Sequence, residues 1–329
     1  MAVITVNNRI YHVTENITLM RFLRDSLKLT SVKDGCSQGA CGTCTVIVDG
    51  KAQRACMFSV EKFDQKNILT TEGLSEHEKQ VYSYAFSHAG AVQCGFCIPG
   101  MVLCAKALID KNPSPTRDDV KKAINSNICR CTGYKKIIDA VILAASIFRE
   151  NKEVPKTDFT GLLGESMHRV DAHKKTIGEA LYADDLYFDD MLYGSALRSK
   201  YPRARVISIN TEEAKKIDGV MCVITAKDLD GKEKIGHLKK DWDVLIKEGN
   251  ITHYLGDAIA LIAAKTQDAL QKAKNAIKVQ YEELPAVFSP KDALKENAPL
   301  VHEDGNILST EHLVRGDADK VIRESKYKV

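Results

Sequence analysis

The sequence predicts a multidomain α+β protein, and three observations lead to this fold class. At 329 residues the chain is long enough for about two domains, or three small ones. Nine of its ten cysteines lie between Cys36 and Cys131, so one part of the chain carries most of the thiol chemistry. The apolar pattern changes along the chain from alternating, to helical, to mixed.

Residues 1–75 predict a small mixed sheet of the ferredoxin-like β-grasp type. The Asn7-Asn8 pair predicts a hairpin turn between two alternating strands. Thr18 is placed to cap a short apolar helix, and a glycine-rich loop follows that helix. Asp49-Gly50 then predicts a second hairpin, whose return strand ends near Phe58.

Residues 76–150 predict a bundle of four short helices, because each shows an apolar stripe at helical spacing. Thr116 and Thr132 are expected as N-caps. The expected helices are Glu76–Ala89, Pro99–Asp110, Thr116–Asn125 and Thr132–Arg149. Residues 151–160 are polar and without period, and they predict a linker.

Residues 161–329 predict an α/β domain. The expected strands are Gly194–Arg198, Arg205–Ile209, Val220–Thr225, Ala258–Ala264 and Ile277–Tyr281. The expected helices are Glu212–Ile217 and Gln267–Ala276, the second capped by Thr266.

The composition excludes several classes of protein. A hydrophobic share of 44% and a charged share of 28% do not fit a disordered or collagen-like chain. A net charge of +3 gives no basic patch for nucleic acid. The N-terminus lacks the regions of a signal peptide, and the uncharged stretch 81–105 contains Pro99 and three cysteines. We therefore expect no membrane contact and a cytoplasmic protein.

The first cysteine set has the spacing of a plant-type [2Fe–2S] site. It is Cys36-x4-Cys41-x2-Cys44, with Cys56 further along the chain. Three thiolates would come from one tight loop and the fourth from a neighbouring strand. Glycines in the loop allow the backbone to fold around a cluster and direct N–H groups at its sulfides. A zinc loop is the alternative, although zinc sites usually show two separated C-x2-C pairs.

The second cysteine set consists of two pairs, Cys94 with Cys97 and Cys129 with Cys131. Each pair directly precedes a predicted helix, so two helix N-termini point at one site. Their partial positive charge suits a cluster of anionic thiolates. Taken alone, the two pairs fit either zinc or a second [2Fe–2S] cluster.

Three strings closely resemble the iron–sulfur part of the molybdenum hydroxylases, the family of xanthine dehydrogenases and aldehyde oxidoreductases. They are GCSQGACGTCTV from Gly35, QCGFCIPGM from Gln93 and NICRCTGY from Asn127. The resemblance implies two [2Fe–2S] clusters, one in the β-grasp domain and one in the helical domain. It also implies that the second cluster lies nearer the molybdopterin, which Gln93 and the backbone of Cys131 touch.

Residues 161–300 resemble the start of the molybdenum subunit of this family. HRVDAHKKTIGEALYADDL, from His168, resembles its entry, and later strings resemble its α/β hammerhead domain. In the family, the following segment holds most molybdopterin contacts and the catalytic glutamate. The sequence ends at Val329 without it, so we expect a truncated chain whose last residues begin the molybdopterin-binding region. No catalytic residue is assigned to the chain.

The domain order also bears on cofactors and partners. Only the linker 151–160 separates the two parts and no GxGxxG motif occurs, so we expect no FAD on this chain. Bacterial aldehyde oxidoreductases and selenium-dependent xanthine dehydrogenases share this order, and CIPGM and DKNPSPTR resemble the latter most. The expected partners are a molybdopterin-binding domain, on the same gene or a separate subunit, and an external electron acceptor protein or FAD subunit. A homodimer stays open.

These observations predict an oxidoreductase. We expect the electron-transfer and N-terminal portion of a molybdenum hydroxylase of the xanthine dehydrogenase or purine hydroxylase type. Electrons would pass from the molybdopterin site through both clusters to the external acceptor. The alternatives are an aldehyde oxidoreductase of the same family, a non-catalytic iron–sulfur electron-transfer subunit, and a zinc-binding interaction module. The two remaining cysteines, Cys104 and Cys222, are assigned to packing as buried free thiols.

Overall fold

The N-terminal sheet is built from two short hairpins. Strands β1 (Ala2–Val6) and β2 (Arg9–Val13) pair antiparallel across Asn7 and Asn8, whose positive φ angles of 47° and 66° form the predicted tight turn. Strands β3 (Thr45–Val48) and β4 (Lys51–Arg54) pair across the predicted Asp49-Gly50 turn. The return strand ends at Arg54 and not near Phe58, because the chain turns at residues 55–56.

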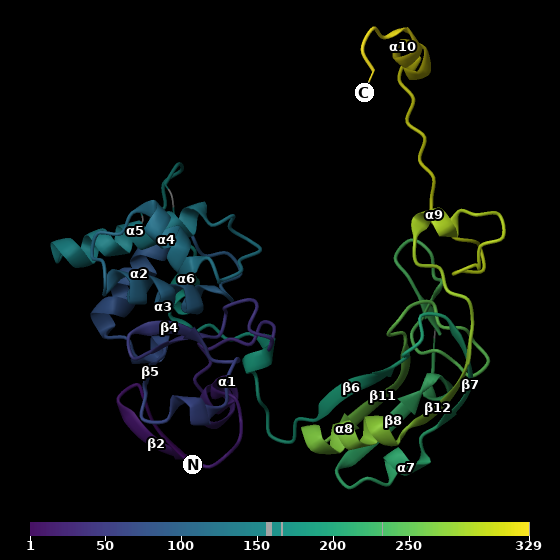
Figure 1. Cartoon of the computed structure of the whole chain (residues 1–329), viewed down its shortest axis with the longest axis horizontal. Coiled ribbons are helices and arrows are strands. Elements are labelled where there is room, and N and C mark those ends of the chain that lie inside the picture. Colours follow the sequence, from purple (N-terminus) through teal and green to yellow (C-terminus); the bar gives the residue numbers. More distant parts are fainter. Residues whose placement is uncertain (156–159, 166, 232, 329) are drawn as a thin grey trace. The chain divides into compact units, whose positions relative to one another are not determined.

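A third connection completes this sheet. Strand β5 (Asn67–Leu69) lies parallel to β1 and antiparallel to β3, which gives the order β2-β1-β5-β3-β4. Figure 1 labels β2, β5 and β4 of this sheet. The Thr18 hydroxyl accepts a hydrogen bond from the Arg21 N–H and caps helix α1 (Leu19–Arg21), as predicted. The helix continues as a π-helical turn, Phe22–Ser26.

All four predicted helices of the bundle are present. They are α2 (Glu76–His88), α3 (Ile98–Ile109), α4 (Arg117–Ile124) and α5 (Lys135–Glu150). Thr116 caps α4 in a reciprocal capping box with Asp119, as predicted. Thr132 does not cap α5, and this prediction was wrong. Gly133 and Tyr134 both have positive φ angles, so the helix begins later and Tyr134 is its N-cap.

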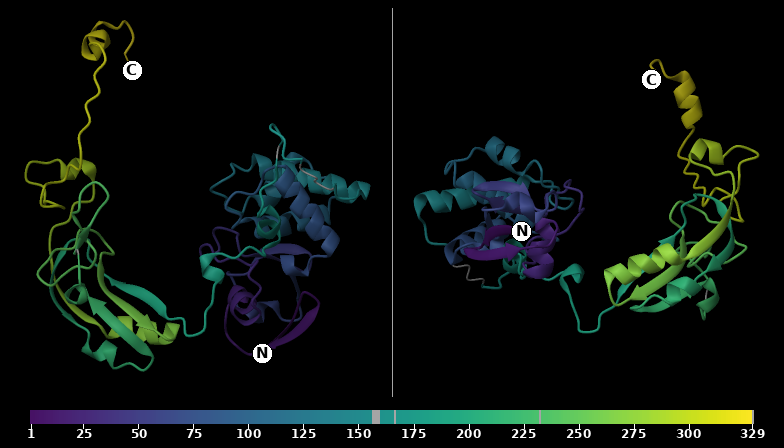
Figure 2. Two further views of the ribbon diagram at one scale, coloured as in Figure 1. Left: turned by 180° about the vertical axis from the view of Figure 1, so that it is seen from behind. Right: turned by 60° about the horizontal axis from the view of Figure 1, so that its bottom comes forward.

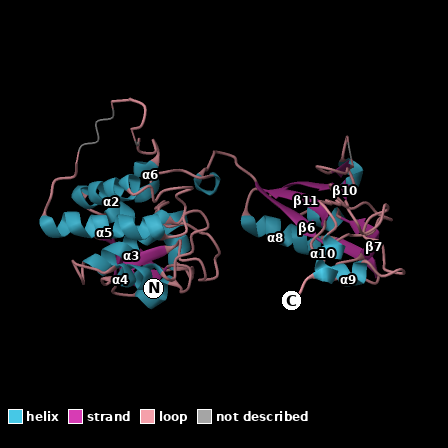
Figure 3. Cartoon of the chain, turned by 90° about the horizontal axis from the view of Figure 1, so that it is seen from above, coloured by secondary structure: helices cyan, strands magenta, loops and turns pink. Residues whose placement is uncertain are grey.

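The bundle core extends beyond the bundle. It includes Ile47 from β3, so the β-grasp sheet and the helices pack directly on each other. It also includes Ala172 from helix α6 (Ala172–Ile177), which Figure 3 shows beside α2. No helix among the described residues is long and apolar enough to cross a membrane, and the stretch 81–105 is divided between α2 and α3.

The computed structural model describes residues 1–155, 160–165, 167–231 and 233–328. Residues 156–159 of the predicted linker lie outside the described part. The chain divides into two units, residues 1–186 and 187–329. Short 3-10 turns occur at Val60–Phe63, Thr71–Gly73, Ala183–Asp185 and Ala226–Asp228.

The second unit contains the five predicted strands, each end within two residues of its expected position. They form a three-stranded sheet of order β6-β11-β8 and a two-stranded sheet β12-β7. The strands are β6 (Tyr193–Arg198), β7 (Ala204–Asn210), β8 (Val220–Thr225), β11 (Ala258–Ala264) and β12 (Lys278–Glu283). A further two-stranded ribbon pairs β9 (Lys234–Ile235) with β10 (Trp242–Asp243).

Two helices of the second unit, α7 (Glu212–Lys215) and α8 (Gln267–Ala276), pack on its three-stranded sheet. Helix α8, capped by Thr266 as predicted, lies along one face in both views of Figure 2 and buries Leu270 in the core. Further short helices are α9 (Pro290–Ala293) and α10 (Ala318–Glu324). Cys222 is exposed on β8, so its assignment to the core was wrong, because its neighbour Val223 occupies the buried face.

Candidate iron–sulfur sites

The loop before β3 gathers backbone N–H groups around the first predicted ligand. The Sγ of Cys36 accepts from the N–H groups of Gln38, Ala40 and Cys41, at N···S distances of 3.4, 3.3 and 3.4 Å. These hydrogen bonds, first that from Gln38, lower the pKa of the Cys36 thiol to about 7. The loop therefore stabilises negative charge on sulfur, as a cluster-binding loop must.

The β3–β4 hairpin brings Cys44 and Cys56 to the loop that carries Cys36 and Cys41. Cys44 is buried at the start of β3, and Cys56 follows β4. Burial raises the pKa of the Cys44 thiol to about 12, and the neighbouring Cys56 and Cys41 thiols add to the rise. Cys41 also lies beside Cys36. The four thiols of the first set are thus gathered at one site.

The second set is gathered from two loops of the bundle. Cys97 is the N-cap of α3, and Cys129 and Cys131 lie in the loop before α5. Burial raises the pKa of the Cys97 thiol, and the charges of Cys129 and Cys94 raise it further. Burial also raises the pKa of Cys94, next to Cys131.

The thiol of Cys129 differs from those of Cys94 and Cys97 in the direction of its pKa shift. Burial alone would raise the pKa of its thiol, but hydrogen bonds from the Thr132 hydroxyl and from the backbone of Cys131 and Thr132 outweigh burial and lower it. The Sγ of Cys129 lies 3.1 Å from the Thr132 Oγ1. Its backbone N–H donates to the Tyr134 hydroxyl at 2.8 Å. The left-handed turn before α5 thus holds this thiol in a polar setting.

Two glycines of the first loop fit a tightly wrapped site. Gly39 and Gly42 have positive φ angles of 73° and 71°. A Cβ at Gly42 would lie 2.4 Å from the Ser126 carbonyl, and one at Gly39 would lie 1.8 Å from the Met57 sulfur. Both positions therefore require glycine. The donors, the backbone and the four thiols in each set fit a [2Fe–2S] group.

A single-ion site is a poorer fit to the same geometry. Among the residues that the structure describes, no three His, Cys, Asp or Glu side chains are placed to hold one metal ion. A structural zinc site needs four ligands around one ion, whereas a two-iron group distributes its four thiolates over two metals. The neighbouring thiols add to the raised pKa of Cys44, Cys94 and Cys97, and a cationic centre displaces the protons of such thiols.

The two sets meet at a short polar seam. The Cys41 carbonyl accepts from the Ile128 N–H at 2.8 Å, and Ile128 directly precedes Cys129. The buried Asn127 amide donates to the Gly42 carbonyl at 2.9 Å. A Cβ at Gly100, in the first turn of α3, would lie 2.8 Å from that same carbonyl. The two loops are thus in direct backbone contact.

Sequence reasoning did not find several residues that support these sites. Asn127, Tyr134 and Tyr182 were not singled out, although the first two lie inside the NICRCTGY string. Tyr182 donates a hydrogen bond to the Cys94 carbonyl at 2.7 Å from 88 residues away. Only the tertiary fold brings this pair together. The predicted contact residue Gln93 is exposed beside Cys94, and Cys131 is also exposed.

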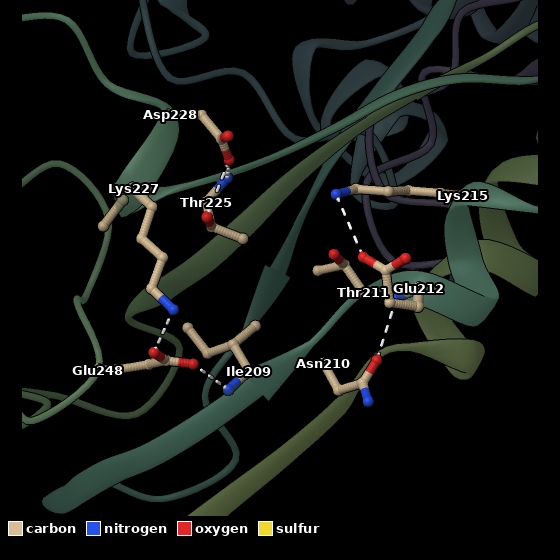
Figure 4. A pocket seen from close by; sticks show the side chains of 10 residues that line it. Ile209, Asn210, Thr211, Glu212, Lys215, Thr225, Lys227, Asp228 and Glu248 are labelled. Atoms are coloured by element: carbon tan, nitrogen blue, oxygen red, sulfur yellow. Dashed lines mark hydrogen bonds and ion pairs between the residues drawn. The ribbon is translucent and has the colours of Figure 1, made fainter.

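The second unit has a cavity of about 320 Å³ that no cysteine lines (Figure 4). Its polar side chains are paired with one another: Glu248 with Lys227, Asp228 with Thr225, and Lys215 with Glu212. A wall whose charges are already compensated in this way offers no cluster of ligands or nucleophiles. We therefore assign no site to this cavity.

Comparison with known families gives three matches along the chain. A 2Fe-2S iron-sulfur cluster binding domain matches residues 6–81, and a [2Fe-2S] binding domain matches residues 70–142. The a/b hammerhead domain of aldehyde oxidase and xanthine dehydrogenase matches residues 177–285. Two domains of the chain therefore belong to [2Fe–2S]-binding families.

The aldehyde oxidoreductase of Megalodesulfovibrio gigas is 36% identical over 339 residues, which cover 96% of this chain and 37% of that protein. The structure of the aldehyde oxidoreductase from Desulfovibrio desulfuricans superposes with a TM-score of 0.83 at 35% identity, covering 92% of this chain and 36% of that one. The chain thus spans little more than a third of these relatives.

Separate subunits match the two halves of the chain. The nicotinate dehydrogenase small FeS subunit of Eubacterium barkeri is 50% identical over 131 residues, covering 39% of this chain and 83% of that subunit. The large molybdopterin subunit from the same organism is 39% identical over 163 residues, covering 50% of this chain and 38% of that subunit.

Proposed function

Because the chain belongs to the molybdenum hydroxylase family of aldehyde oxidoreductases and xanthine dehydrogenases, we propose that it relays electrons within such an enzyme. The observation that carries the proposal is the gathering of eight thiols into two sets that meet at one seam. The clusters supply one-electron redox chemistry when bound, between a molybdopterin site and an external acceptor.

We assign four ligands to each cluster. Cys36, Cys41, Cys44 and Cys56 hold the β-grasp cluster. Cys94, Cys97, Cys129 and Cys131 hold the bundle cluster. The N–H groups directed at Cys36 and the Thr132 hydroxyl beside Cys129 stabilise thiolate charge at each site. Because all four ligands of each cluster come from one domain, we expect each cluster site to form when its own domain folds.

The seam between the sets supports transfer from one site to the other. The Cys41 carbonyl and the Ile128 N–H form a direct hydrogen bond, so two ligand-bearing loops are joined without an intervening side chain. Gly100 and the Asn127 amide keep α3 and the β3 loop in contact. These contacts hold the two ligand-bearing loops together.

The exposed side of the bundle site is where we place the molybdopterin. Gln93, Cys94 and Cys131 are exposed, whereas Cys97 is buried. We propose that Gln93 and the Cys131 backbone contact the cofactor, which a molybdopterin-binding domain would carry. The partner at the other end is an external acceptor protein or an FAD subunit, and this chain carries no FAD. Thiolate ligands and unpaired thiols suit a reducing compartment, so we place the protein in the cytoplasm.

We propose hydroxylation of a purine, of the xanthine dehydrogenase type, as the activity of the whole enzyme. Aldehyde oxidation is the second candidate, and a specific observation favours it. The aldehyde oxidoreductase of M. gigas carries counterparts of all three domains in one chain. Turnover of xanthine against an aldehyde by the holoenzyme distinguishes the two.

Metal analysis of the purified chain tests the relay. We expect a brown protein with about four irons per chain, reducible by dithionite, with two paramagnetic signals. Anaerobic purification and zinc analysis provide the control. A colourless protein with stoichiometric zinc would overturn the proposal.

A further inference from the structure

The segment that follows the bundle contacts both cluster-binding domains. We call residues Asp171–Asp185 the strap. It contains helix α6 and ends in the 3-10 turn Ala183–Asp185. It lies within the first unit of the chain, so its contacts there belong to one compact body. These contacts fall on the turn that carries Cys94 and on the β-grasp domain.

At the bundle, the strap binds the backbone of the Gln93–Cys94 turn. The Tyr182 hydroxyl donates to the Cys94 carbonyl at 2.7 Å, and its ring packs edge-on against Phe96 at 5.2 Å. The Lys175 ammonium donates to the Gln93 carbonyl at 3.4 Å. Two neighbouring carbonyls of the ligand turn therefore accept hydrogen bonds from the strap.

The turn itself is shaped to receive the strap. Gly95 has a positive φ angle of 86°, and a Cβ there would lie 2.7 Å from the Lys175 side chain. Lys175 is held in place by an ion pair with Asp171 at 2.7 Å. The strap therefore packs closely on the turn at Gly95.

At the β-grasp domain, the strap ends in a buried ion pair. Asp185 pairs with Lys33 at 2.5 Å and with Arg24 at 3.0 Å, and the Asp185 and Lys33 side chains are each 1% exposed. The Lys33 ammonium also lies 4.7 Å from the centre of the Tyr182 ring. A buried charge that loses its partner is costly. The strap is therefore fixed at this end with Tyr182 in contact with both domains.

We propose that the strap sets the electrostatics of the bundle site, with Tyr182 and Lys175 as positioning residues for the Cys94 ligand. The inference rests on the proposed function, since it requires that Cys94 hold a cluster. The Tyr182 hydroxyl points the positive end of its dipole at the Cys94 carbonyl, and the Lys175 ammonium, whose charge Asp171 partly offsets, donates to the Gln93 carbonyl. Positive potential favours the reduced, more negative state of the cluster. The strap therefore raises the reduction potential of the bundle cluster.

Redox titration of the full chain, followed by electron paramagnetic resonance, tests this. Tyr182→Phe keeps the ring and its packing but removes the donor. We expect the reduction equilibrium of the bundle cluster to become less favourable by about threefold to tenfold, the size of one hydrogen bond. The β-grasp cluster should not shift. Tyr11→Phe, in strand β2, is the matched control and should shift neither cluster.

A second pair of variants tests the lysine contact of the strap separately from the Tyr182 contact. Lys175→Met should shift the bundle cluster in the same direction, whereas Lys174→Met removes the same charge from the exposed neighbour and should shift it less. If both clusters are present and Tyr182→Phe and Lys175→Met leave the bundle potential unchanged, the role of the strap is wrong and the relay stands. A wild-type chain without clusters would instead overturn the proposed function.

Discussion

The Asn127 amide lies buried between the two cluster-binding domains. Its Nδ2 donates to the Gly42 carbonyl at 2.9 Å, and its Oδ1 accepts from the Cys104 thiol at 3.2 Å. Cys104 is buried, as the apolar helix around it predicts, but it also orients this amide. Sequence reasoning could assign the thiol to packing, but its partner is 23 residues away and belongs to another element.

Replacing Asn127 or Cys104 by alanine, one at a time, separates the contribution of hydrogen bonding to stability from that of packing. We expect Asn127→Ala to lower the free energy of unfolding by about 1–3 kcal/mol, because it removes a buried amide together with its hydrogen bonds to the Gly42 carbonyl and the Cys104 thiol. The Gly42 carbonyl itself still accepts from the Thr45 N–H and hydroxyl. Cys104→Ala, the matched control, should cost less, since it removes one small side chain. Urea unfolding followed by far-UV circular dichroism measures both. Equal losses in the two variants would show that the seam does not depend on the amide.

The stability that the strap contributes depends on pH through the Asp185 carboxylate. Burial raises its pKa, but hydrogen bonds from Lys33, the Tyr182 N–H and Arg24 outweigh burial and hold the pKa below the usual range. A carboxyl with a depressed folded pKa contributes stability above its unfolded pKa, about 3.9, and loses that stability as pH falls through the folded value.

We therefore expect the stability difference between wild type and Asp185→Asn to be largest near neutral pH and to shrink below about pH 4. Thermal melting across this range measures it. Asp184→Asn is the control, because Asp184 pairs with the same Arg24 but is 68% exposed. A difference for Asp185→Asn that stays constant between about pH 6 and pH 3 would contradict the assignment.

Among the elements, those with strong local patterns are the ones that the sequence predicts. The hairpins at Asn7-Asn8 and Asp49-Gly50 and the helices of the bundle follow from turn residues and apolar period. Strand β5 was missed because three residues show no alternation, and pairing with β1 and β3 defines it. The start of α5 was misplaced because two left-handed residues precede it.

The cysteine sets belong to different elements, which allows them to be separated. Cys56 follows strand β4 and Cys129 precedes helix α5. Replacing either by alanine removes one bond to iron. We expect Cys56→Ala to abolish one paramagnetic signal of the reduced protein and to leave the other. Cys129→Ala should do the reverse, and Cys104→Ala should change neither.

Metal binding couples to folding, so each ligand variant also needs a structural readout. Circular dichroism and limited proteolysis report whether the other domain stays folded. Loss of both signals from a variant whose other domain is intact would require the eight cysteines to be reassigned across the two motifs.

Across the whole molecule, the first unit extends to Leu186, well past the bundle. The spacing of cysteines predicts where clusters bind, but it does not predict that residues 171–185 complete that unit. Local pattern assigns this segment to the region after the linker, whereas Ala172 packs in the bundle core and Asp185 pairs with Lys33. The Asp185–Lys33 pair joins residues 152 positions apart, and neither contact leaves a periodic signal in the sequence.

Two fragments test this boundary. We expect residues 1–186 to hold both clusters with the melting behaviour of the full chain's first unit. A fragment of residues 1–160 should be less stable by about 3–5 kcal/mol, because Lys33 and Arg24 lose a buried partner. Melting temperature and iron per chain measure both effects. A shorter fragment as stable as the longer one would show that the first unit does not need the strap.

The covalent connection between α5 and the strap affects how firmly the strap stays bound to the bundle. Residues 151–170 join α5 to the strap, and those of them that the structure describes form no helix or strand, so the strap is covalently linked to the bundle by a short segment. A short tether sets an effective concentration on the order of millimolar, so weak strap contacts suffice to keep it bound. Where an iron–sulfur part and a molybdopterin part are separate subunits, as in the nicotinate dehydrogenase of E. barkeri, their association depends on the concentration of each subunit. In this chain, a change at Lys175 or Tyr182 is therefore expected to weaken the contacts of the strap without releasing the strap from the first unit.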